Sequence, residues 1–334
     1  MQVHGPVVAK YRDFAAYAAD DSPCFHAWAL GVTEDVEVQE WLADLPTDKQ
    51  QPNLVFAAAR WHGLEAPAPY EALRAVLLGD DGSIRTTILR RATQTNEAGR
   101  MATLAPAFAR LANGSPLALV EVGASAGLCL YPDRWGYRWE TRNGVRTAGP
   151  AEPTMTCQVT GPAPLPTGMP RVVWRGGVDL NPLDVTDSYD MGWLLTLVWP
   201  EHDDRRRLLG MAVRVARADP PALRQGDLTE MLPDLVEEAR SAVEPVGGRV
   251  VVFHSAVIAY LEQAARARYV ETISGLVAEG RCHWVSNEGP GVLPDVTRTG
   301  PEPPSGRFVL GIDGRSVGHT HGHGRALHWW SAGA

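Results

Sequence analysis

The sequence contains few cysteines and no surplus of positive charge. Its four cysteines lie far apart and form no Cys-x-x-Cys pair, which argues against a disulfide framework and against a zinc knuckle. The formal net charge of −8 argues against a general nucleic-acid-binding protein, because neutralising phosphates requires a basic surface. The acidic balance favours a small molecule or a peptide as the substrate.

Long apolar runs are also missing. The longest, at about 191–199 and 250–261, are too short to cross a bilayer. The first residues carry no basic segment followed by an apolar core, so we expect no signal peptide and a cytoplasmic protein without a membrane partner. A hydrophobic content of 45% over 334 residues is enough for a sizeable core in one large domain or two smaller ones. Nothing in the pattern indicates an oligomeric state.

The first third of the chain predicts helices and no strands. Apolar residues recur at helical spacing, and Ser22-Pro23 is a capping residue followed by a proline at the first helical position. The last and longest helix of this part is expected over about 83–112. We therefore predict an N-terminal helical domain over residues 1–113.

That last predicted helix carries a dense group of hydrogen-bonding side chains. Gln94, Glu97 and Arg100 are three residues apart and would share one helix face. Arg91 and Asn96 lie beside them. One interpretation is a solvated face with ion pairs along the helix. The other is a lid that presents these five side chains to a polar substrate.

The most informative motif of the sequence is the stretch from Leu117 to Leu128. A short apolar run ends at Glu121 and is followed by Gly123, Ser125 and Gly127, which predicts a buried strand, a tight turn and the start of a helix. Glycines let the backbone approach a ligand closely, and amides at a helix start favour anionic groups. The stretch fits a nucleotide-type cofactor site, a Gly-x-Ser-x-Gly nucleophile turn, or a turn without a ligand.

From residue 114 to 334 strands alternate with helices, and the chain closes with a hairpin signal at Asp313-Gly314. This alternation predicts a Rossmann-like, mostly parallel sheet with a terminal antiparallel hairpin. Residues at about 131–170 are rich in proline and glycine and are interpreted as an insertion. Ligands of such sheets bind at the carboxyl ends of the strands. Polar residues are found at five predicted strand ends: Glu121, Asp179, Asp227, His254 and Glu288.

This arrangement resembles the class I S-adenosylmethionine-dependent methyltransferases. In that superfamily the first turn packs against the methionine part of the cofactor, an acid after the second strand binds the ribose, and a residue after the third lies near the adenine. The resemblance assigns these cofactor-binding roles, in that order, to Glu121, Gly123, Ser125 and Gly127, to Asp179 with Asn181 in the turn after it, and to Asp227.

Most of the chain also resembles an uncharacterised prokaryotic family, domain of unknown function 2332. The motifs that carry this resemblance are Gln94-Thr-Asn-Glu97-x-x-Arg100, Glu121-Val-Gly-Ala-Ser-Ala-Gly127, Asp179-Leu-Asn-Pro182, Trp199-Pro200, Phe253-His254-Ser255 and His323-Gly324 followed by Trp329. The family name implies a methyltransferase-like fold and no particular reaction.

Two features depart from the methyltransferase pattern. Ser125 stands where the superfamily has its middle glycine, which narrows the space beside the cofactor or supplies a hydroxyl to it. The ribose-binding acid usually follows the turn by roughly 20 residues, and Asp179 is much farther away. Either residues 131–170 are inserted before Asp179, which we favour, or Glu140 binds the ribose instead.

Methyl transfer requires an acceptor held near the methyl carbon and, for weak acids, a base. His254 is the first candidate for this catalytic role, because histidine titrates near neutrality, and Glu288 is the second. A hydrogen-bonded structural histidine is the alternative for His254. The alternating His319, His321 and His323 suit a solvated hairpin better than a metal site, so no metal is expected.

We therefore predict an S-adenosylmethionine-binding enzyme, most simply a methyltransferase for a small molecule. One alternative is an enzyme that cleaves or cyclises the same sulfonium without methyl transfer. Another is a serine hydrolase with Ser125 as nucleophile and a later acid and histidine, such as Glu288 and His323. A binding protein without catalysis is the fourth possibility.

Overall fold

The structure is a computed structural model that describes residues 5–94 and 96–330. The chain divides into two compact units. One contains residues 1–95 together with Ser188–Gly210, and the other contains Asn96–Asp187 together with the chain from Met211 onward. None of the described helices is long and apolar enough to cross a membrane.

The first unit is helical, as the sequence predicts. Ser22 accepts a hydrogen bond from the amide of Phe25 and Pro23 opens the second helix, so the predicted cap is confirmed. Aromatic rings form the core, where Phe25 stacks on Trp28 and meets Phe56 edge-on. The helices are α1 (Gly5–Ala18), α2 (Pro23–Glu34), α3 (Val36–Ala43), α4 (Pro52–Trp61), α5 (Tyr70–Leu78), α6 (Ser83–Arg90), α8 (Ser188–Leu197) and the first part of α9 (Asp203–Ala218), with the 3-10 turn η1 (Thr47–Lys49).

The long helix predicted over 83–112 does not form. Helix α6 ends at Arg90, and helical structure resumes only with η2 (Ala98–Arg100) and α7 (Met101–Ala112). Side chains from elsewhere in the first unit bind the carbonyl groups that a continuing helix would use: Lys49 donates to Arg91 O and Trp193 to Ala92 O. The prediction that Gln94, Glu97 and Arg100 share a helix face is therefore wrong.

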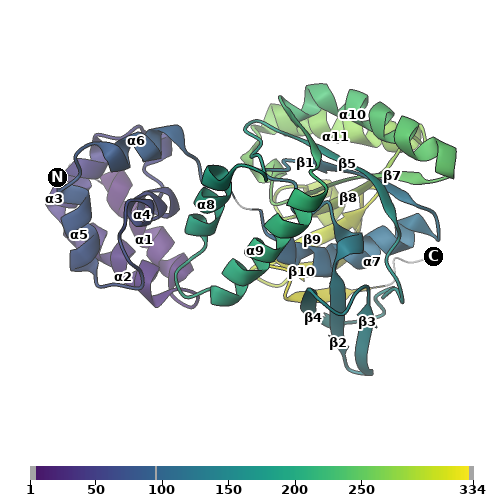
Figure 1. The fold of residues 1–334 in the computed structure, drawn as a ribbon, viewed down its shortest axis with the longest axis horizontal. Helices are drawn as coiled ribbons and strands as arrows, with labels where there is room; N and C mark the ends of the chain where they lie inside the picture. The colour runs from purple at the N-terminus through teal and green to yellow at the C-terminus, as the bar shows by residue number, and fades with distance from the viewer. Residues whose placement is uncertain (1–4, 95, 331–334) are drawn as a thin grey trace. The chain divides into compact units, whose positions relative to one another are not determined.

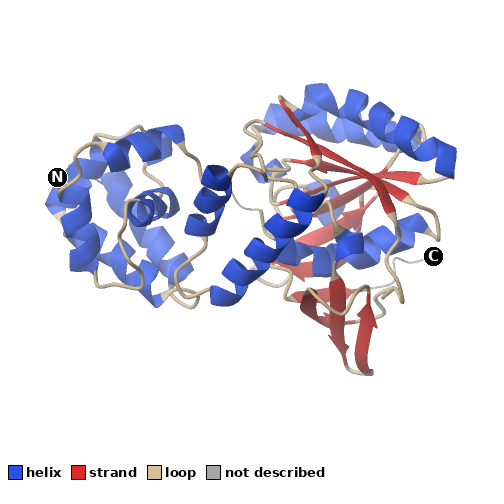
Figure 2. Ribbon diagram, in the orientation of Figure 1, coloured by secondary structure: helices blue, strands red, loops and turns tan. Residues whose placement is uncertain are grey.

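The second unit is built on one mixed sheet, which Figure 2 shows in red. In the described part of the chain it has eleven strands in the order β3-β2-β4-β11-β10-β9-β8-β7-β1-β5-β6, and six of the ten neighbouring pairs are parallel. The strands are β1 (Leu117–Val122), β2 (Gly136–Thr141), β3 (Gly144–Ala148), β4 (Thr154–Thr160), β5 (Val172–Asp179), β6 (Ala222–Gln225), β7 (Arg249–Ser255), β8 (His283–Glu288), β9 (Arg307–Ile312), β10 (Arg315–His321) and β11 (Ala326–Trp329). The predicted mostly parallel sheet with antiparallel strands at its C-terminal end is confirmed.

The helix predicted after β1 is absent from the described residues. Gly123, Ser125 and Gly127 have φ values of 68°, 51° and 69°, and alternate left-handed residues cannot continue into a right-handed helix. The chain instead passes through η3 (Pro132–Arg134) into the hairpin β2–β3 and then β4. Residues 131–170 thus add three strands to the sheet beyond β11.

Helices cover both faces of the sheet near β1. Helices α10 (Leu228–Val243) and α11 (Gln263–Ala278) share one core with Val120, Val252 and Trp284. Helix α7 covers the other face (Figure 1). There Phe108 packs edge-on against Phe253. The smaller elements of this unit are η4 (Glu244–Val246), η5 (Ile258–Tyr260) and α12 (Pro294–Thr297). Because side chains alternate along a strand, each strand residue belongs to the α10–α11 face or to the α7 face.

A buried ion pair anchors the chain as it leaves the turn after β1. The guanidinium of Arg175, on β5, donates to both carboxylate oxygens of Asp133 at 2.9 Å, and the Arg175 side chain is 5% exposed. Removing Asp133 leaves the buried guanidinium only the more distant carboxylate of Asp219, which is 3.6 Å away and 58% exposed. We expect Asp133→Ala to lower the free energy of unfolding by about 3 kcal/mol.

Chemical denaturation of both proteins measures this loss. The matched control is Asp295→Ala, which removes an ion pair with Arg298 whose side chains are 84% and 72% exposed. That variant should lose less than about 1 kcal/mol. Equal losses in the two variants would contradict a special contribution from the buried pair.

Candidate functional site

The carboxyl ends of β1, β5, β7 and β8 lie along one edge of the sheet, since neighbouring strands in this group are parallel. Register decides which of their polar side chains share a face. Glu121 pairs with Gly177 on β5 and with Phe253 on β7, and Ser255 pairs with Asn287 on β8. Alternation from these pairs places Glu121, Asp179, Ser255 and Asn287 on the α7 face.

His254 and Glu288 lie on the opposite face, beneath α11. The Nδ1 atom of His254 is 2.7 Å from Glu288 Oε1, and its Nε2 accepts a hydrogen bond from the Trp284 indole at 3.0 Å. The imidazole is fully buried and packs edge-on against Tyr269. Glu288 Oε1 also accepts from the amides of Val257 and Ile258. These contacts favour a structural role for His254, the alternative already open from the sequence.

The turn after β1 is held against β5 by its own backbone. The amides of Gly123 and Ala124 both donate to Val178 O, at 2.8 and 3.1 Å. The Ser125 amide donates to Asp179 Oδ2 at 2.8 Å. A Cβ atom on Gly123 would lie 2.3 Å from Val257, so a side chain at this position would collide with the loop that follows β7.

Asn96 fixes the other side of the same turn. Its amide nitrogen donates to Ala124 O at 3.2 Å, and its carbonyl oxygen accepts from the Leu128 amide at 2.8 Å. One side chain therefore satisfies a carbonyl and an amide that the missing helix would otherwise have used. Asn96 was predicted as a substrate or lid residue, and the structure places it in the wall of the turn.

Glu121 is the most unusual group at this edge. Its side chain comes from the last part of β1, is 5% exposed, and has no hydrogen-bond partner for Oε2 among the described residues. Burial raises the pKa of Glu121 well above the usual carboxyl range, and the Asp179 carboxylate adds to the rise. The guanidinium of Arg100 acts in the opposite direction. A buried carboxyl group with an unpaired oxygen is costly, and such groups are frequent at binding sites.

Of the two acids considered for the ribose, only Asp179 adjoins the turn. Its Oδ1 accepts from the Asn181 amide at 2.8 Å, while Oδ2 holds Ser125. Glu140 lies on β2, which is separated from β1 by six strands, and it pairs with Arg138. Asp227 is exposed and caps α10 by accepting from the amides of Thr229 and Glu230. Capping alone accounts for an aspartate at that position.

Arg100 connects the site to the hairpin that follows β10. Its Nη1 donates to Ser255 O and its Nε to Gly322 O, both at 2.8 Å. Next to it, the Asn287 amide donates to the Ser255 hydroxyl at 2.8 Å, and Thr320 donates to the Asn287 carbonyl at 2.6 Å. These three polar side chains form a continuous hydrogen-bonded row on the α7 face.

Sequence reasoning missed Ser255, Asn287 and Thr320. Each is a direct neighbour of a residue that attracted attention instead: His254, Glu288 and the alternating histidines. The information that sequence reasoning lacked is the face of the sheet to which each of these side chains points. In strands covered on both faces by helices, apolar residues fill both sets of positions, so the sequence alone does not reveal which set faces which helix.

The two remaining residues of the predicted lid lie in the first unit. Arg91 pairs with Asp190 at 2.7 Å and lies 4.4 Å from the centre of the Tyr189 ring. Gln94 is half-buried. The predicted group is thus divided, with Asn96, Glu97 and Arg100 in the second unit.

Ser125 combines a left-handed backbone with a buried hydroxyl. Its φ is 51°, its side chain is 4% exposed, and its Oγ has no hydrogen-bond partner among the described residues. A hydrolase nucleophile needs a histidine within hydrogen-bonding distance. No histidine in the described chain makes this contact, and no group of three metal-binding side chains is found there either.

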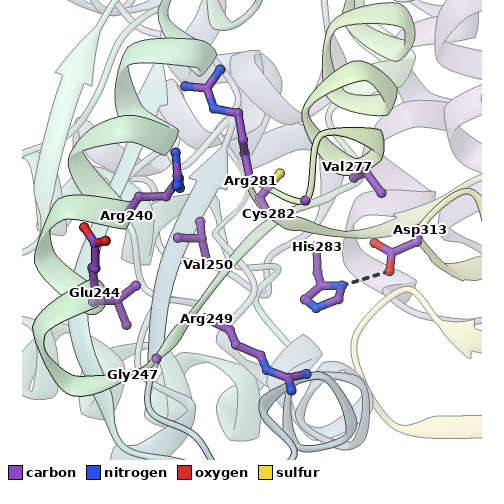
Figure 3. A pocket seen from close by; sticks show the side chains of 13 residues that line it. Arg240, Glu244, Gly247, Arg249, Val250, Val277, Arg281, Cys282, His283 and Asp313 are labelled. Carbon is purple, nitrogen blue, oxygen red and sulfur yellow. Dashed lines mark hydrogen bonds and ion pairs between the residues drawn. The ribbon is translucent and has the colours of Figure 1, made fainter.

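A cavity of about 580 Å³ lies at the opposite edge of the sheet, where β7 and β8 begin. Figure 3 shows Arg240, Arg249 and Arg281 on its wall with their guanidinium groups pointing in different directions. His283 on the same wall pairs with Asp313 at 2.9 Å. The cavity has no part in the cluster around Glu121.

The chain belongs to the family described as "Uncharacterized protein conserved in bacteria (DUF2332)", whose model matches residues 8–329. This confirms the family expected from the sequence motifs. Neither a curated protein nor a solved structure matches the chain. The family description assigns no reaction, so the site itself must supply the argument for function.

The raised pKa of Glu121 has a consequence for stability. The folded protein holds this proton more tightly than the unfolded chain, so the stabilisation is complete below the ordinary carboxyl range and is lost as pH rises through the raised pKa. Glu121→Gln removes the titration. We expect wild type and Glu121→Gln to have similar melting temperatures at about pH 4. Toward neutral pH the melting temperature of the variant should rise increasingly above that of the wild type.

Thermal unfolding across this pH range measures the difference. Glu237→Gln is the control of opposite sign, because Arg281 lowers the pKa of the exposed Glu237. Relative to wild type, that variant should lose stability as pH rises. A difference in melting temperature between wild type and Glu121→Gln that is the same at every pH would contradict the raised pKa of Glu121.

Proposed function

We propose that this member of the uncharacterized bacterial family binds S-adenosylmethionine at the turn after β1 and transfers its methyl group to a small molecule. The observation that carries the proposal is the buried, unpartnered carboxylate oxygen of Glu121 beside that turn. The methionine part of the cofactor brings an ammonium group and a sulfonium. Either cation would pair with the ionised carboxylate and offset the cost of burying it.

The strand order supports this location. Numbered in chain order, the parallel strands β1, β5, β6, β7 and β8 have the order 3-2-1-4-5 in the sheet. This is the order of doubly wound Rossmann sheets, in which ligands bind where the chain reverses direction across the sheet. Here the reversal lies between β1 and β7, and Glu121 and Ser255 stand at the carboxyl ends of those two strands.

Asp179 supports a nucleoside at the neighbouring strand end. Each of its carboxylate oxygens accepts one backbone hydrogen bond, which leaves lone pairs for the two hydroxyl groups of a ribose. Leu180 and Tyr260 follow β5 and β7 and are 71% and 86% exposed. Large exposed side chains such as these, just beyond the carboxyl ends of two strands, can pack against the flat faces of an adenine ring.

Ser125 is the position at which this turn differs from the usual glycine turn. It occupies the middle position with the left-handed backbone that a glycine usually supplies, and its buried hydroxyl has no partner among the described residues. A hydroxyl at this point can donate to the cofactor carboxylate. The turn can therefore accommodate S-adenosylmethionine, with the Ser125 hydroxyl contacting the cofactor where a glycine would leave space.

Isothermal titration calorimetry with S-adenosylmethionine and its demethylated product tests the proposal. We expect both to bind the wild-type protein. Asp179→Asn should weaken binding by about 1.5–3 kcal/mol, the cost of losing hydrogen bonds to a charged group. Glu140→Gln, the matched control on β2, should bind as the wild type does. Absence of binding to either ligand would refute the proposal.

Proton release gives a second, independent prediction. Because Glu121 is protonated in the free protein at a pH below its raised pKa, binding of a cation should expel that proton. The calorimetric enthalpy should therefore depend on the ionisation enthalpy of the buffer, and affinity should rise with pH. Glu121→Gln should abolish both effects, whereas Glu140→Gln should preserve them. A buffer-independent enthalpy for the wild type would contradict the role of Glu121.

Products separate methyl transfer from the other reactions. Release of methylthioadenosine from S-adenosylmethionine alone would identify cleavage or cyclisation of the sulfonium. Inactivation by a serine-reactive phosphonate, prevented by Ser125→Ala, would favour the hydrolase. Demethylated cofactor formed only when a small-molecule acceptor is present supports the methyltransferase.

A further inference from the structure

The hairpin turn between β10 and β11 is locked onto the segment that precedes α7. Gly324 has φ of 75°, and a Cβ atom there would lie 1.9 Å from Gly99 O. On the same side, Arg100 Nε donates to Gly322 O at 2.8 Å. Only glycine allows this close approach, and the approach brings His323 to the same segment.

His323 meets a buried acid there. Its Nδ1 is 3.1 Å from Glu97 Oε2, and the exposed fractions of the two side chains are 21% and 7%. A sulfur–oxygen contact of 3.4 Å joins Cys129 to Glu97 O, which ties the acid to the turn after β1. One ring nitrogen of His323 therefore faces a carboxylate whose own residue is fixed to the turn after β1.

The pair stands at the same edge of the sheet as Glu121. Strand β9 is antiparallel to β8, and β10 is antiparallel to β9, so β10 runs in the direction of β8 and β7. His323 follows the carboxyl end of β10. Arg100 connects its neighbour Gly322 to Ser255 at the end of β7.

His254, the first candidate from the sequence, lacks what a base needs. Both of its ring nitrogens are engaged, and the imidazole is fully buried on the other face. His323 is partly exposed, and no hydrogen-bond partner of its Nε2 is found among the described residues. A histidine with one nitrogen facing a carboxylate and the other partly exposed is the arrangement of a general base.

We infer that His323 is the general base of the transfer reaction and that Glu97 is its positioning residue; this rests on the proposed function. His323 Nε2 takes the proton from an acceptor O–H or N–H group. The freed electron pair of the acceptor forms the bond to the methyl carbon, and the carbon–sulfur bond breaks with its electrons remaining on sulfur. The sulfonium becomes a neutral thioether, and the charge moves to an imidazolium beside Glu97.

The first test is the tautomer of His323, read by ¹⁵N NMR of the full-length protein with imidazole-labelled histidine. His323→Asn assigns the signal. We expect the proton on Nδ1 and a bare Nε2 at a pH where the ring is neutral, because the Glu97 carboxylate 3.1 Å from Nδ1 favours a proton on that nitrogen. Glu97→Gln should shift the spectrum toward a mixture of tautomers. A proton on Nε2 in the wild type would overturn the assignment of His323 as base.

The second test measures whether the open nitrogen lies at the cofactor. Diethyl pyrocarbonate modifies unprotonated imidazole nitrogens, and peptide mass spectrometry locates the product. We expect His323 to react and saturating demethylated cofactor to protect it. His283, which pairs with Asp313 at the opposite edge of the sheet, is the matched control and should keep its reactivity. If His323 is modified equally with and without saturating demethylated cofactor, the inference is overturned.

Binding distinguishes failure of this inference from failure of the proposed function. His323→Asn should bind S-adenosylmethionine within about twofold of wild type, since a base that acts on the acceptor adds little ground-state affinity. Absence of binding to the wild type refutes the proposed function. Binding to the wild type without protection of His323 refutes the His323–Glu97 pair alone.

Discussion

The turn at 123–127 depends on hydrogen bonds from two side chains outside it. Asp179 holds the Ser125 amide, and Asn96 takes both Ala124 O and the Leu128 amide. Three left-handed residues in five leave this segment without a repeating hydrogen-bond pattern of its own, so its polar backbone groups need such partners. The shape of the site after β1 is therefore set by β5 and by the segment before α7, and a substitution in either would change it.

Strand alternation is the second constraint, and it separates the polar residues into two groups. Glu121, Asp179, Ser255 and Asn287 share the α7 face, where Arg100 binds the backbone. His254 and Glu288 lie one residue away along β7 and β8 and belong to the core under α11. A one-residue step in a strand thus separates a hydrogen-bonded structural pair from the polar side chains on the α7 face.

Much of the fold could be predicted from local sequence patterns. The helices of the first unit, the cap at Ser22 and the strand ending at Glu121 follow from spacing, capping chemistry and β-branched runs. The failures have one physical origin. At Arg91, at Ala92 and after Gly127, side chains from elsewhere in the chain, such as those of Lys49, Trp193 and Asn96, bind backbone groups that a helix would use. Such partners are far away in sequence, so propensity cannot anticipate them.

The sequence by itself determined the family, the mixed sheet and the turn at which Glu121, Gly123 and Asp179 were expected to meet. Tertiary structure decided which of the two histidines is buried and which is partly exposed. His254 is prominent in the sequence because it ends an apolar strand, and it is buried between Glu288 and Trp284 for that same reason. His323 stands in a glycine-rich hairpin that resembled a solvated loop. It meets Glu97 only because Gly324 lets two segments more than 200 residues apart come into contact.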